Sequence, residues 1–458
     1  MSDGDKRELL RKLLAKKNAP AASNGTSGPA TSAPKEGDFD NYSYDLFLSG
    51  AGTELTEGSR FAEWVQKARA ERLYAFQAPR LAAQRTSTRL RREDGAEYDV
   101  LNFSSYNYLG YGVEPTVVEA AKEALDRWGL GAASSPAVSG YMALHVRREG
   151  MLADAYNVYG HDYGATVFSS GYGVNLGAIP AIIKQDGYVV LDAEAHMSLV
   201  EGAKLSGGRI RYFRHNDADH LRQVLGEVCD GKTRVLVCLE GVYSASGDIG
   251  AVRTLGEIAK ERGAMVLVDE AHSSLLMGDK ALGVVEHENA LDVVDFIVLT
   301  FSKAFGAVGG ALLCPRELVP YFNWFSRTRF FSCALDPAVT GGLIRVCELG
   351  FGPDGDQRRR RLHENAARLR RQLEGRVPVS DSRTWLLPVI FGADDLMLKV
   401  YDWLQSRGLD TSVMGFPATP KNQARARIFV TSEHTAEQLD RAADLLAEAG
   451  ETFGFALR

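Results

Sequence analysis

Cysteine is scarce in this sequence, and its five residues lack the paired spacings that bring thiolates onto one zinc ion. The sequence therefore predicts no metal site. An odd and scattered set of this kind suits a reducing cytoplasm, which is the location we expect. The five residues are Cys229, Cys238, Cys314, Cys333 and Cys347.

Long apolar runs and an excess of basic residues are absent as well. No run reaches the length that spans a membrane, so we expect no membrane span. The formal net charge is -6, which gives no reason to expect nucleic acid, because its phosphates demand clustered Lys and Arg. The N-terminus has neither a long apolar region nor a small-residue cleavage site, so a secretory signal is not expected.

Two N-terminal segments precede the globular part of the chain. Residues 6–17, KRELLRKLLAKK, place leucines at helical spacing among cations and predict a short amphipathic helix. Residues 18–37 are rich in Ala, Pro, Ser, Gly and Thr, which predicts a flexible linker. We take 1–40 as this helix and disordered linker. We take 41–111 as an N-terminal helical segment, with a helical stretch at about 59–83.

The centre of the chain, 112–346, alternates short apolar runs with helical patterns. Continuously apolar strands alternating with helices predict a seven-stranded, mostly parallel sheet covered on both faces. A smaller C-terminal α+β domain is predicted at 347–458, with strands in WLLPVIF (385–391) and RARIFV (425–430). The seven central runs are ATVFS (165–169), YVVLD (188–192), RIRYF (209–213), RVLVCLE (234–240), AMVLVDE (264–270), DFIVLTF (295–301) and GALLC (310–314).

A lysine follows one of these predicted strands. In such sheets, ligands bind beyond the carboxyl ends of the strands. The run DFIVLTF leads into SKAFG, which places Lys303 in that position. A Schiff base with an aldehyde cofactor would remove the cost of burying a free ammonium there and would create an electrophile. The alternative is a solvated turn lysine.

Three other polar clusters also follow predicted strands. Asp269 ends AMVLVD and could hold a pyridinium nitrogen, with His272 three residues further on. The letters DEAH also occur in metal sites, which would need further ligands, and in helicases, which would need a P-loop that the chain lacks. Ser170, Gly171 and Tyr172 begin a predicted helix whose amide groups could bind a phosphate, although glycine often marks only a turn.

His196 follows the run YVVLD, where an imidazole could stack on a pyridine ring. Alone, such a histidine is more often an ordinary core or surface residue.

The motifs taken together resemble the α-oxoamine synthases. This family includes 8-amino-7-oxononanoate synthase, 2-amino-3-ketobutyrate CoA ligase, 5-aminolevulinate synthase and serine palmitoyltransferase. The resemblance runs from about Asn102 to the C-terminus, and it implies the pyridoxal 5'-phosphate (PLP) fold type I architecture and a homodimer. The motifs are NYLG (107–110), SGYGVN (170–175), AHMS (195–198), EGVYSASGD (240–248), DEAHS (269–273), TFSKAFG (300–306) and RARIFVTSEHT (425–435).

The resemblance implies a role for each matching residue. Lys303 would form the Schiff base with PLP, Asp269 would pair with the pyridine nitrogen, and His196 would stack on the ring with Ala271 on its opposite face. The other implied contacts are Ser244 and His272 to the ring oxygen, Gly171, Tyr172 and Thr300 around the phosphate, and Asn107 and Arg427 to the amino-acid carboxylate. Without the family, Arg427 would be read as a surface arginine.

One position departs from the family pattern. Family members carry a Ser-Thr pair that reaches the partner subunit's phosphate, whereas this chain has Ser332 followed by Cys333, a weaker hydrogen-bond donor. Ser332 alone is therefore predicted to make that contact.

The implied reaction is a decarboxylative condensation of an α-amino acid with an acyl thioester, giving an α-aminoketone. The thioester would be carried by coenzyme A or by an acyl carrier protein. The segment 6–17 suggests the carrier protein, because it resembles the terminal segments of polyketide and peptide synthase proteins. Two alternatives stay open: an aminotransferase of the same fold, and a non-catalytic partner subunit. Such subunits lose the lysine, and Lys303 is present.

Overall fold

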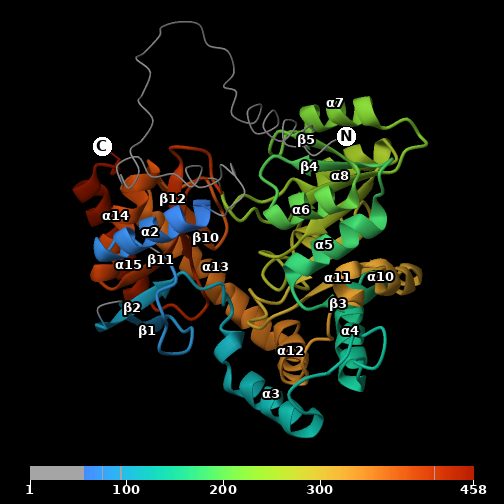
Figure 1. Ribbon diagram of the computed structural model, residues 1–458, viewed down its shortest axis with the longest axis horizontal. Helices are drawn as coiled ribbons and strands as arrows, with labels where there is room; N and C mark the ends of the chain where they lie inside the picture. The colour runs from blue at the N-terminus through green and yellow to red at the C-terminus, as the bar shows by residue number, and fades with distance from the viewer. Residues whose placement is uncertain (1–55, 75, 93–94, 417, 458) are drawn as a thin grey trace, which may run out of the picture. The chain divides into compact units, whose positions relative to one another are not determined.

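Two β-sheets organise the protein. The computed structural model describes residues 56–74, 76–92, 95–416 and 418–457. The helix predicted at 6–17 and the linker predicted at 18–37 lie outside the described residues. Figure 1 shows the strands of the smaller sheet at the left and those of the larger sheet at the right.

The larger sheet has seven strands in the order β3-β9-β8-β7-β6-β4-β5. All seven runs predicted from the sequence form these strands. The sheet is parallel apart from β9, which runs antiparallel to both β3 and β8. The strands are β3 (Tyr163–Phe168), β4 (Tyr188–Asp192), β5 (Arg209–Phe213), β6 (Val235–Glu240), β7 (Met265–Asp269), β8 (Phe296–Thr300) and β9 (Gly310–Pro315).

Helices cover the larger sheet and bury its apolar side chains. Every residue of β6 is buried, as expected for a strand inside a sheet that is covered on both faces. Helix α5 contributes Val174 and Ile179, both fully buried, to the core between helix and sheet. The helices are α3 (Pro115–Trp128), α4 (Ala143–Tyr156), α5 (Gly171–Ile182), α6 (Met197–Ser206), α7 (Ala218–Val228), α8 (Val252–Glu261), α9 (Val284–His287), α10 (Val319–Phe325), α11 (Arg327–Phe330) and α12 (Pro337–Gly350).

The smaller sheet joins strands that are distant in sequence, in the order β1-β2-β11-β12-β10. Strand β2 pairs with β11 in parallel, so that Leu101 faces Leu409. The strands are β1 (Ser87–Arg91), β2 (Glu97–Phe103), β10 (Leu386–Gly392), β11 (Leu409–Met414) and β12 (Ala424–Phe429).

The segment 41–111, predicted as helical, differs from that prediction. Its helix α2 (Thr56–Ala70) ends well before residue 83, and the segment then supplies β1 and β2 to the smaller sheet. In β1, STRLR, only Thr88 and Leu90 are buried, because successive side chains of a strand point to opposite faces and only one face of this edge strand is covered. Its charged outward residues hide the strand pattern in the sequence.

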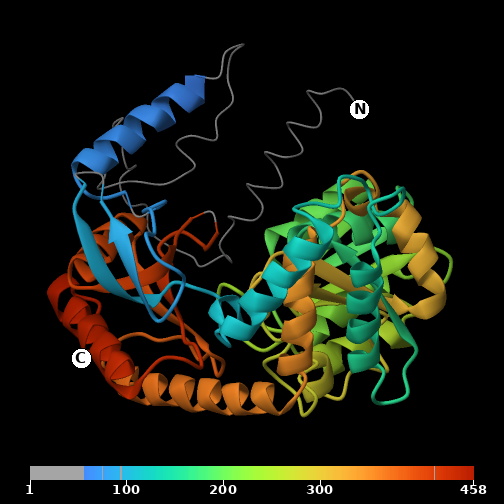
Figure 2. The same ribbon diagram turned by 90° about the horizontal axis from the view of Figure 1, so that it is seen from below.

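The C-terminal part continues from α12 into a long helix. The domain boundary proposed at residue 347 falls within α12. Figure 2 shows α13 running between the elements of the two sheets. Among the described residues, no helix has the length and apolar character needed to cross a membrane. The remaining helices are α13 (Pro353–Leu373), α14 (Asp394–Ser406) and α15 (Ala436–Phe453).

Candidate active site

The carboxyl ends of the parallel strands meet at one edge of the larger sheet and bring the predicted side chains together there. Lys303 lies in the turn after β8 and is only partly exposed. Burial lowers the pKa of its amine to about 8, against the opposing influence of Asp269 and Glu240, and Arg427 lowers it further. A lysine with this pKa is available as a nucleophile and as a base near neutral pH.

Asp269 ends β7 and is 5% exposed. One carboxylate oxygen accepts a hydrogen bond from the Asn175 side-chain amide at 2.8 Å, and the other accepts from the Ala271 backbone N–H at 3.0 Å. These two donors hold the carboxylate in one orientation. The Ala271 contact is made by its backbone, and its place on one face of the ring stays a prediction.

Asn175 is a site residue that the sequence reasoning missed. Its amide also donates to Ser198 Oγ at 2.9 Å, and Ser198 Oγ lies 2.8 Å from His196 Nδ1. A chain of hydrogen bonds thus links the carboxylate of Asp269 to the imidazole of His196. Asn175 is the only amide or charged side chain in α5, GYGVNLGAIPAI, and an unpaired amide buried in such a helix is costly. That contrast was the signal in the sequence.

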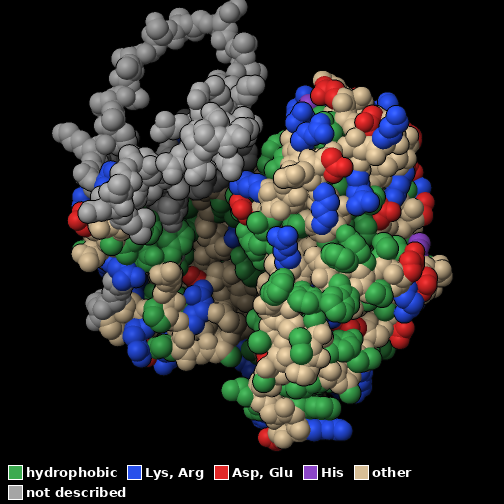
Figure 3. Space-filling model, turned by 45° about the vertical axis from the view of Figure 1, so that its right-hand side comes forward, with side chains coloured by type: hydrophobic (Ala, Val, Ile, Leu, Met, Phe, Trp, Pro, Cys, Tyr) green, Lys and Arg blue, Asp and Glu red, His purple; other side chains and the backbone are tan. Residues whose placement is uncertain are grey.

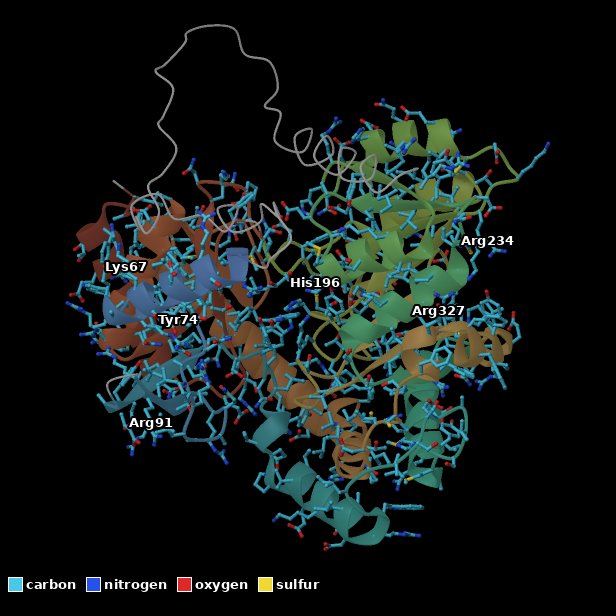
Figure 4. The ribbon with its side chains drawn as sticks, viewed as in Figure 1. Lys67, Tyr74, Arg91, His196, Arg234 and Arg327 are labelled. Atoms are coloured by element: carbon cyan, nitrogen blue, oxygen red, sulfur yellow. The ribbon has the colours of Figure 1, made fainter. Side chains whose placement is uncertain are left out.

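His196 caps the N-terminus of α6 and leaves its ring exposed. Its backbone N–H donates to Glu240. The ring of Tyr172 packs edge-on against its imidazole, with 6.1 Å between the two ring centroids. Burial lowers the pKa of His196. Asp269 acts in the opposite direction, but the positive charges of Lys303 and Arg427 lower the pKa further. Figure 4 shows His196 on the side of the larger sheet that faces the smaller sheet. A neutral, accessible imidazole is able to stack on a ring.

Glu240 is the second residue that the sequence reasoning missed. It ends β6 and stands in register with Asp269 of the neighbouring strand. Burial raises its pKa to about 8, and the adjacent Asp269 raises it too. A pKa of about 8 favours the protonated form of Glu240 at neutral pH. Like Asp269, it is the acidic end of an apolar strand, and that shared feature could have revealed it.

His272 is 2% exposed, and its Nδ1 lies 2.8 Å from the hydroxyl of Tyr108. Burial lowers the pKa of His272 well below its usual value, and the cations Lys303 and Arg427 contribute in the same direction. Burial also raises the pKa of Tyr108 well above its usual value, so the phenol keeps its proton and can donate it to Nδ1. His272 is then a neutral imidazole with its Nε2–H available as a donor.

The N-terminus of α5 forms an anion-binding corner. Ser170 caps the helix by accepting a hydrogen bond from Gly173 N–H at 2.9 Å. A Cβ on Gly171 would overlap the Thr300 hydroxyl at the end of β8, so only glycine fits there. The close approach places Thr300 beside the first amide groups of a twelve-residue helix, whose dipole favours a phosphate. Ser170, Gly171, Tyr172 and Thr300 are thus brought together as predicted.

Arg427 of β12 lies near the same cluster and is not a surface arginine. Its guanidinium donates to the Ser244 carbonyl at 3.2 Å, to the Ser412 hydroxyl at 2.9 Å and to the Tyr106 hydroxyl at 3.3 Å. Its Nε is buried and has no hydrogen-bond partner among the described residues. A buried donor without an acceptor is costly, and a substrate carboxylate would satisfy it.

Asn107 joins this end of the cluster through the Lys303 turn. Its side-chain oxygen accepts from Gly112 N–H at 3.1 Å. Gly306, three residues after Lys303, has a φ of 67° and approaches so closely that a Cβ would overlap the Gly112 nitrogen. The side chain of Asn107 is therefore held beside the turn that carries the lysine.

Replacing Arg427 by alanine is expected to raise the KM for the amino acid by about 10- to 100-fold, because a hydrogen bond to a charged group is worth about 1.5–3 kcal/mol. PLP binding should change much less. Arg427→Lys keeps the charge but loses the two-pronged geometry, and it should show an intermediate KM. The measurement is steady-state kinetics beside PLP titration. Wild-type amino-acid kinetics in Arg427→Ala would transfer the role to Arg425 or another cation.

Ser332 is not brought into this cluster within the described residues. Its backbone N–H bonds to the Arg329 carbonyl at 3.5 Å, and its neighbours Phe331 and Cys333 are exposed. The contact with a partner's cofactor stays a prediction.

The assembled residues fit PLP. The buried, unpartnered Nε of Arg427, the glycine-only corner at Thr300 and the lysine with a pKa near 8 each match one part of a cofactor–substrate pair. Asp269, held by two donors, offers an anion for a pyridine nitrogen.

Comparisons with known proteins agree with this reading. Residues 98–446 match the family described as aminotransferase class I and II. An 8-amino-7-oxononanoate synthase from Thermoanaerobacter pseudethanolicus is 32% identical over 359 residues, which are 78% of this chain and 89% of that protein. Another from Pseudescherichia vulneris is 32% identical over 391 residues, covering 83% and 99%.

Solved structures give the same picture. A serine palmitoyltransferase from S. paucimobilis, solved with a bound PLP–myriocin aldimine, superposes with a TM-score of 0.82 at 30% identity. The match covers 88% of this chain and all of that one.

Proposed function

Since this chain belongs to the α-oxoamine synthases, within the aminotransferase class I and II family, we propose that it condenses an α-amino acid with an acyl thioester carried by an acyl carrier protein. Enzymes of this group are PLP-dependent acyltransferases that perform decarboxylative condensations. The observation that carries the amino-acid half of the proposal is Arg427, whose buried Nε finds no partner in the part of the chain that the structure describes and whose charge acts on Lys303.

The roles of the residues follow from their surroundings. Arg427 and Asn107 orient the amino-acid carboxylate. Lys303 Nζ, once it is free of the cofactor, takes the Cα proton, since a pKa of about 8 leaves part of the amine unprotonated at neutral pH. Asp269 keeps a proton on the pyridine nitrogen, and bound PLP supplies the electron sink for the resulting carbanion. His272 Nε2–H is available to donate to the ring oxygen or to the acyl carbonyl.

The reaction balances without a further reagent. A bond forms between the amino-acid Cα and the acyl carbonyl carbon, and the thiol leaves. The carboxylate of the amino acid leaves as carbon dioxide, and a proton returns to Cα. The product is an α-aminoketone.

The acyl carrier protein enters the proposal from the sequence of residues 1–37, which lie outside the described residues. A cationic amphipathic segment on a linker of about twenty residues would raise the local concentration of a weakly bound acidic partner. This arrangement supports a place for the enzyme in polyketide-type natural product biosynthesis.

Deleting residues 1–37 separates docking from chemistry. With a carrier-bound acyl donor at low salt, kcat/KM for release of carbon dioxide and α-aminoketone should fall by about 10-fold or more, because the docking segment raises the effective concentration of the donor. PLP content and kcat/KM with the acyl-CoA donor should be unchanged. High salt should lower the kcat/KM of the full-length enzyme with the carrier-bound donor toward that of the truncated enzyme.

A charge-reversed variant, Lys6→Glu with Lys12→Glu, tests the same interaction without shortening the chain. Equal kcat/KM for full-length and truncated enzyme with the carrier-bound donor would remove the carrier protein from the proposal. Formation of pyridoxamine phosphate from the amino acid alone, without carbon dioxide, would instead identify an aminotransferase.

A homodimer is the second part of the proposal. Figure 3 shows hydrophobic side chains exposed over the right-hand body of the molecule. Several large apolar side chains of the larger-sheet part are more than half exposed and could be covered by a partner subunit: Leu130 at 81%, Val138 at 78% and Phe331 at 82%. A sedimentation-equilibrium mass of about 50 kDa instead of twice that value would contradict the dimer.

A further inference from the structure

Two loops at the carboxyl edge of the larger sheet carry side chains assigned to the cofactor. The His196 loop (193–196) follows β4, and the Ser244 loop (241–250) follows β6. In the strand order, β4 lies between β6 and the edge strand β5. Residues directly after β5 contact Asp192, the β4 residue that immediately precedes the His196 loop, and also contact the Ser244 loop. No role in cofactor or substrate binding has been given to them above.

His215 bridges an acid at the start of one loop and an acid within the other. Its Nδ1 lies 3.0 Å from Asp192, the last residue of β4, and its Nε2 lies 3.3 Å from Asp248 of the Ser244 loop. The ring of Tyr243, next to Ser244, meets the imidazole edge-on at 4.4 Å. Both imidazole nitrogens therefore connect the end of β4, where the His196 loop begins, to the Ser244 loop.

Asn216 makes a second set of bonds between the same partners. Its backbone N–H donates to the other oxygen of Asp192 at 3.0 Å. Its side chain donates to the Ile249 carbonyl at 3.1 Å and accepts from the Ala251 N–H at 3.0 Å. The residue has a φ of 51°, a left-handed conformation that asparagine tolerates better than most residues.

The charges around His215 favour its protonated form. Burial acts against the imidazolium, but the hydrogen bonds to Asp192 and Asp248 outweigh it, and Glu194 adds to their effect, so that the pKa rises to about 10. Only the imidazolium can donate from both ring nitrogens at once. The doubly bonded geometry and the positive charge therefore depend on each other.

We propose that His215 and Asn216 are positioning residues that hold the His196 loop and the Ser244 loop in register, and so fix the stacking imidazole and Ser244 around the cofactor. The inference rests on the proposed function only for the roles of His196 and Ser244.

The Ser244 loop also transmits position to the substrate end. Its carbonyls at Ser244 and Ala245 accept hydrogen bonds from Arg427 and Arg425, respectively. At the end of β4, the fully buried carboxylate of Asp192 also accepts from the Glu194 N–H at 2.8 Å. Removing His215 would leave that buried carboxylate with less compensation, so the turn that leads to His196 would have to rearrange.

The test begins with PLP-free protein and compares His215→Ala with wild type by hydrogen–deuterium exchange. We expect exchange to rise about 10-fold or more in peptides covering 193–200 and 241–250, because charge-assisted hydrogen bonds are lost from both loops. In the loaded protein, the PLP dissociation constant should rise about 10-fold. The visible circular dichroism of the bound cofactor should weaken.

Two controls and two milder variants make the outcome specific. Asp219→Asn removes an exposed carboxylate on α7, and His287→Ala removes an exposed histidine at the end of α9; both should match wild type. Asp248→Asn should lower the pH at which a carbon-13-labelled His215 imidazole titrates by more than one unit, since one of its two carboxylates is gone. Asn216→Asp removes the donor to Ile249 and adds a carboxylate beside His215 Nε2, but it keeps the acceptor for Ala251 and the backbone bond to Asp192, so it should raise exchange less than His215→Ala.

Unchanged exchange in both loops, or His215 titration unaffected by Asp248→Asn, overturns the inference. If His215→Ala fails to fold, Asp248→Asn and Asn216→Asp decide in its place. These readouts use the PLP-free protein, so they can succeed even if no condensation product is found. In that case only the proposed function fails.

Discussion

Replacing Lys303 by alanine is expected to lower turnover by at least about 10³-fold, because the variant loses both the covalent attachment and the group that takes the Cα proton. Wild-type protein should be yellow, and borohydride reduction should fix PLP on Lys303 permanently. The alanine variant should bind PLP only reversibly, and reduction should leave it unlabelled. Turnover is measured as α-aminoketone release, and the label is located by peptide mapping.

Lys204→Ala is the matched control, since Lys204 is an exposed lysine of α6 that pairs with Glu201. This variant should keep the label, the colour and the turnover of wild type. Recovery of the label on a lysine other than Lys303 in the wild-type protein would overturn the assignment of Lys303 as the residue that binds PLP covalently.

The second large effect is expected for Asp269→Asn, which should keep part of its PLP yet lose at least about 100-fold in turnover. An amide cannot stabilise a proton on the pyridine nitrogen, so the ring no longer withdraws electrons from the carbanion. The neighbouring Asn175 can still pair with the new amide by rotating its own, so the fold should survive. Thermal unfolding and PLP titration check the fold and the binding.

Glu240→Gln tests whether the effect of Asp269→Asn comes from the lost negative charge, because Glu240 lies on the neighbouring strand. Glu240 stands in register with Asp269 but holds a proton at neutral pH, because its pKa is raised to about 8. A glutamine there changes no charge at pH 7, so its loss of turnover should be much smaller than that of Asp269→Asn. Equal losses in the two variants, or near-normal turnover in Asp269→Asn, would contradict the role given to Asp269.

The strands of the two sheets differ in how well they could be predicted. Most strands of the larger sheet are buried on both faces and read as continuous apolar runs, whereas its edge strand β5, RIRYF, is largely exposed; all seven were predicted. Strands β1, β2 and β11 were not predicted. Strand β1 reads STRLR, with charged residues facing out, and β2 finds its parallel partner β11 about three hundred residues further along the chain. No local pattern contains that pairing.

The site shows the same division. Lys303, Asp269, His272 and His196 follow strands, and their positions could be predicted because parallel strands end at one edge of a sheet. Asn175, Glu240, Tyr108 and His215 act through contacts made across elements, so the reasoning passed over them. Ser332 was predicted to contact the partner's cofactor, and within the described residues it does not join the cluster around Lys303.

The sequence by itself determined the parallel sheet through its strand patterns and the PLP-dependent family through the resemblance of its motifs, and it predicted the lysine that would hold the cofactor, because strand patterns and strand-end motifs are local properties of the chain. Only the tertiary structure decided the ionisation and orientation of the groups. The pKa values near 8 of Lys303 and Glu240, the neutral His272 and the clamped Asp269 come from burial and from charges on other elements. Desolvation and Coulomb interactions depend on distances in space, and those distances exist only once the strands have assembled.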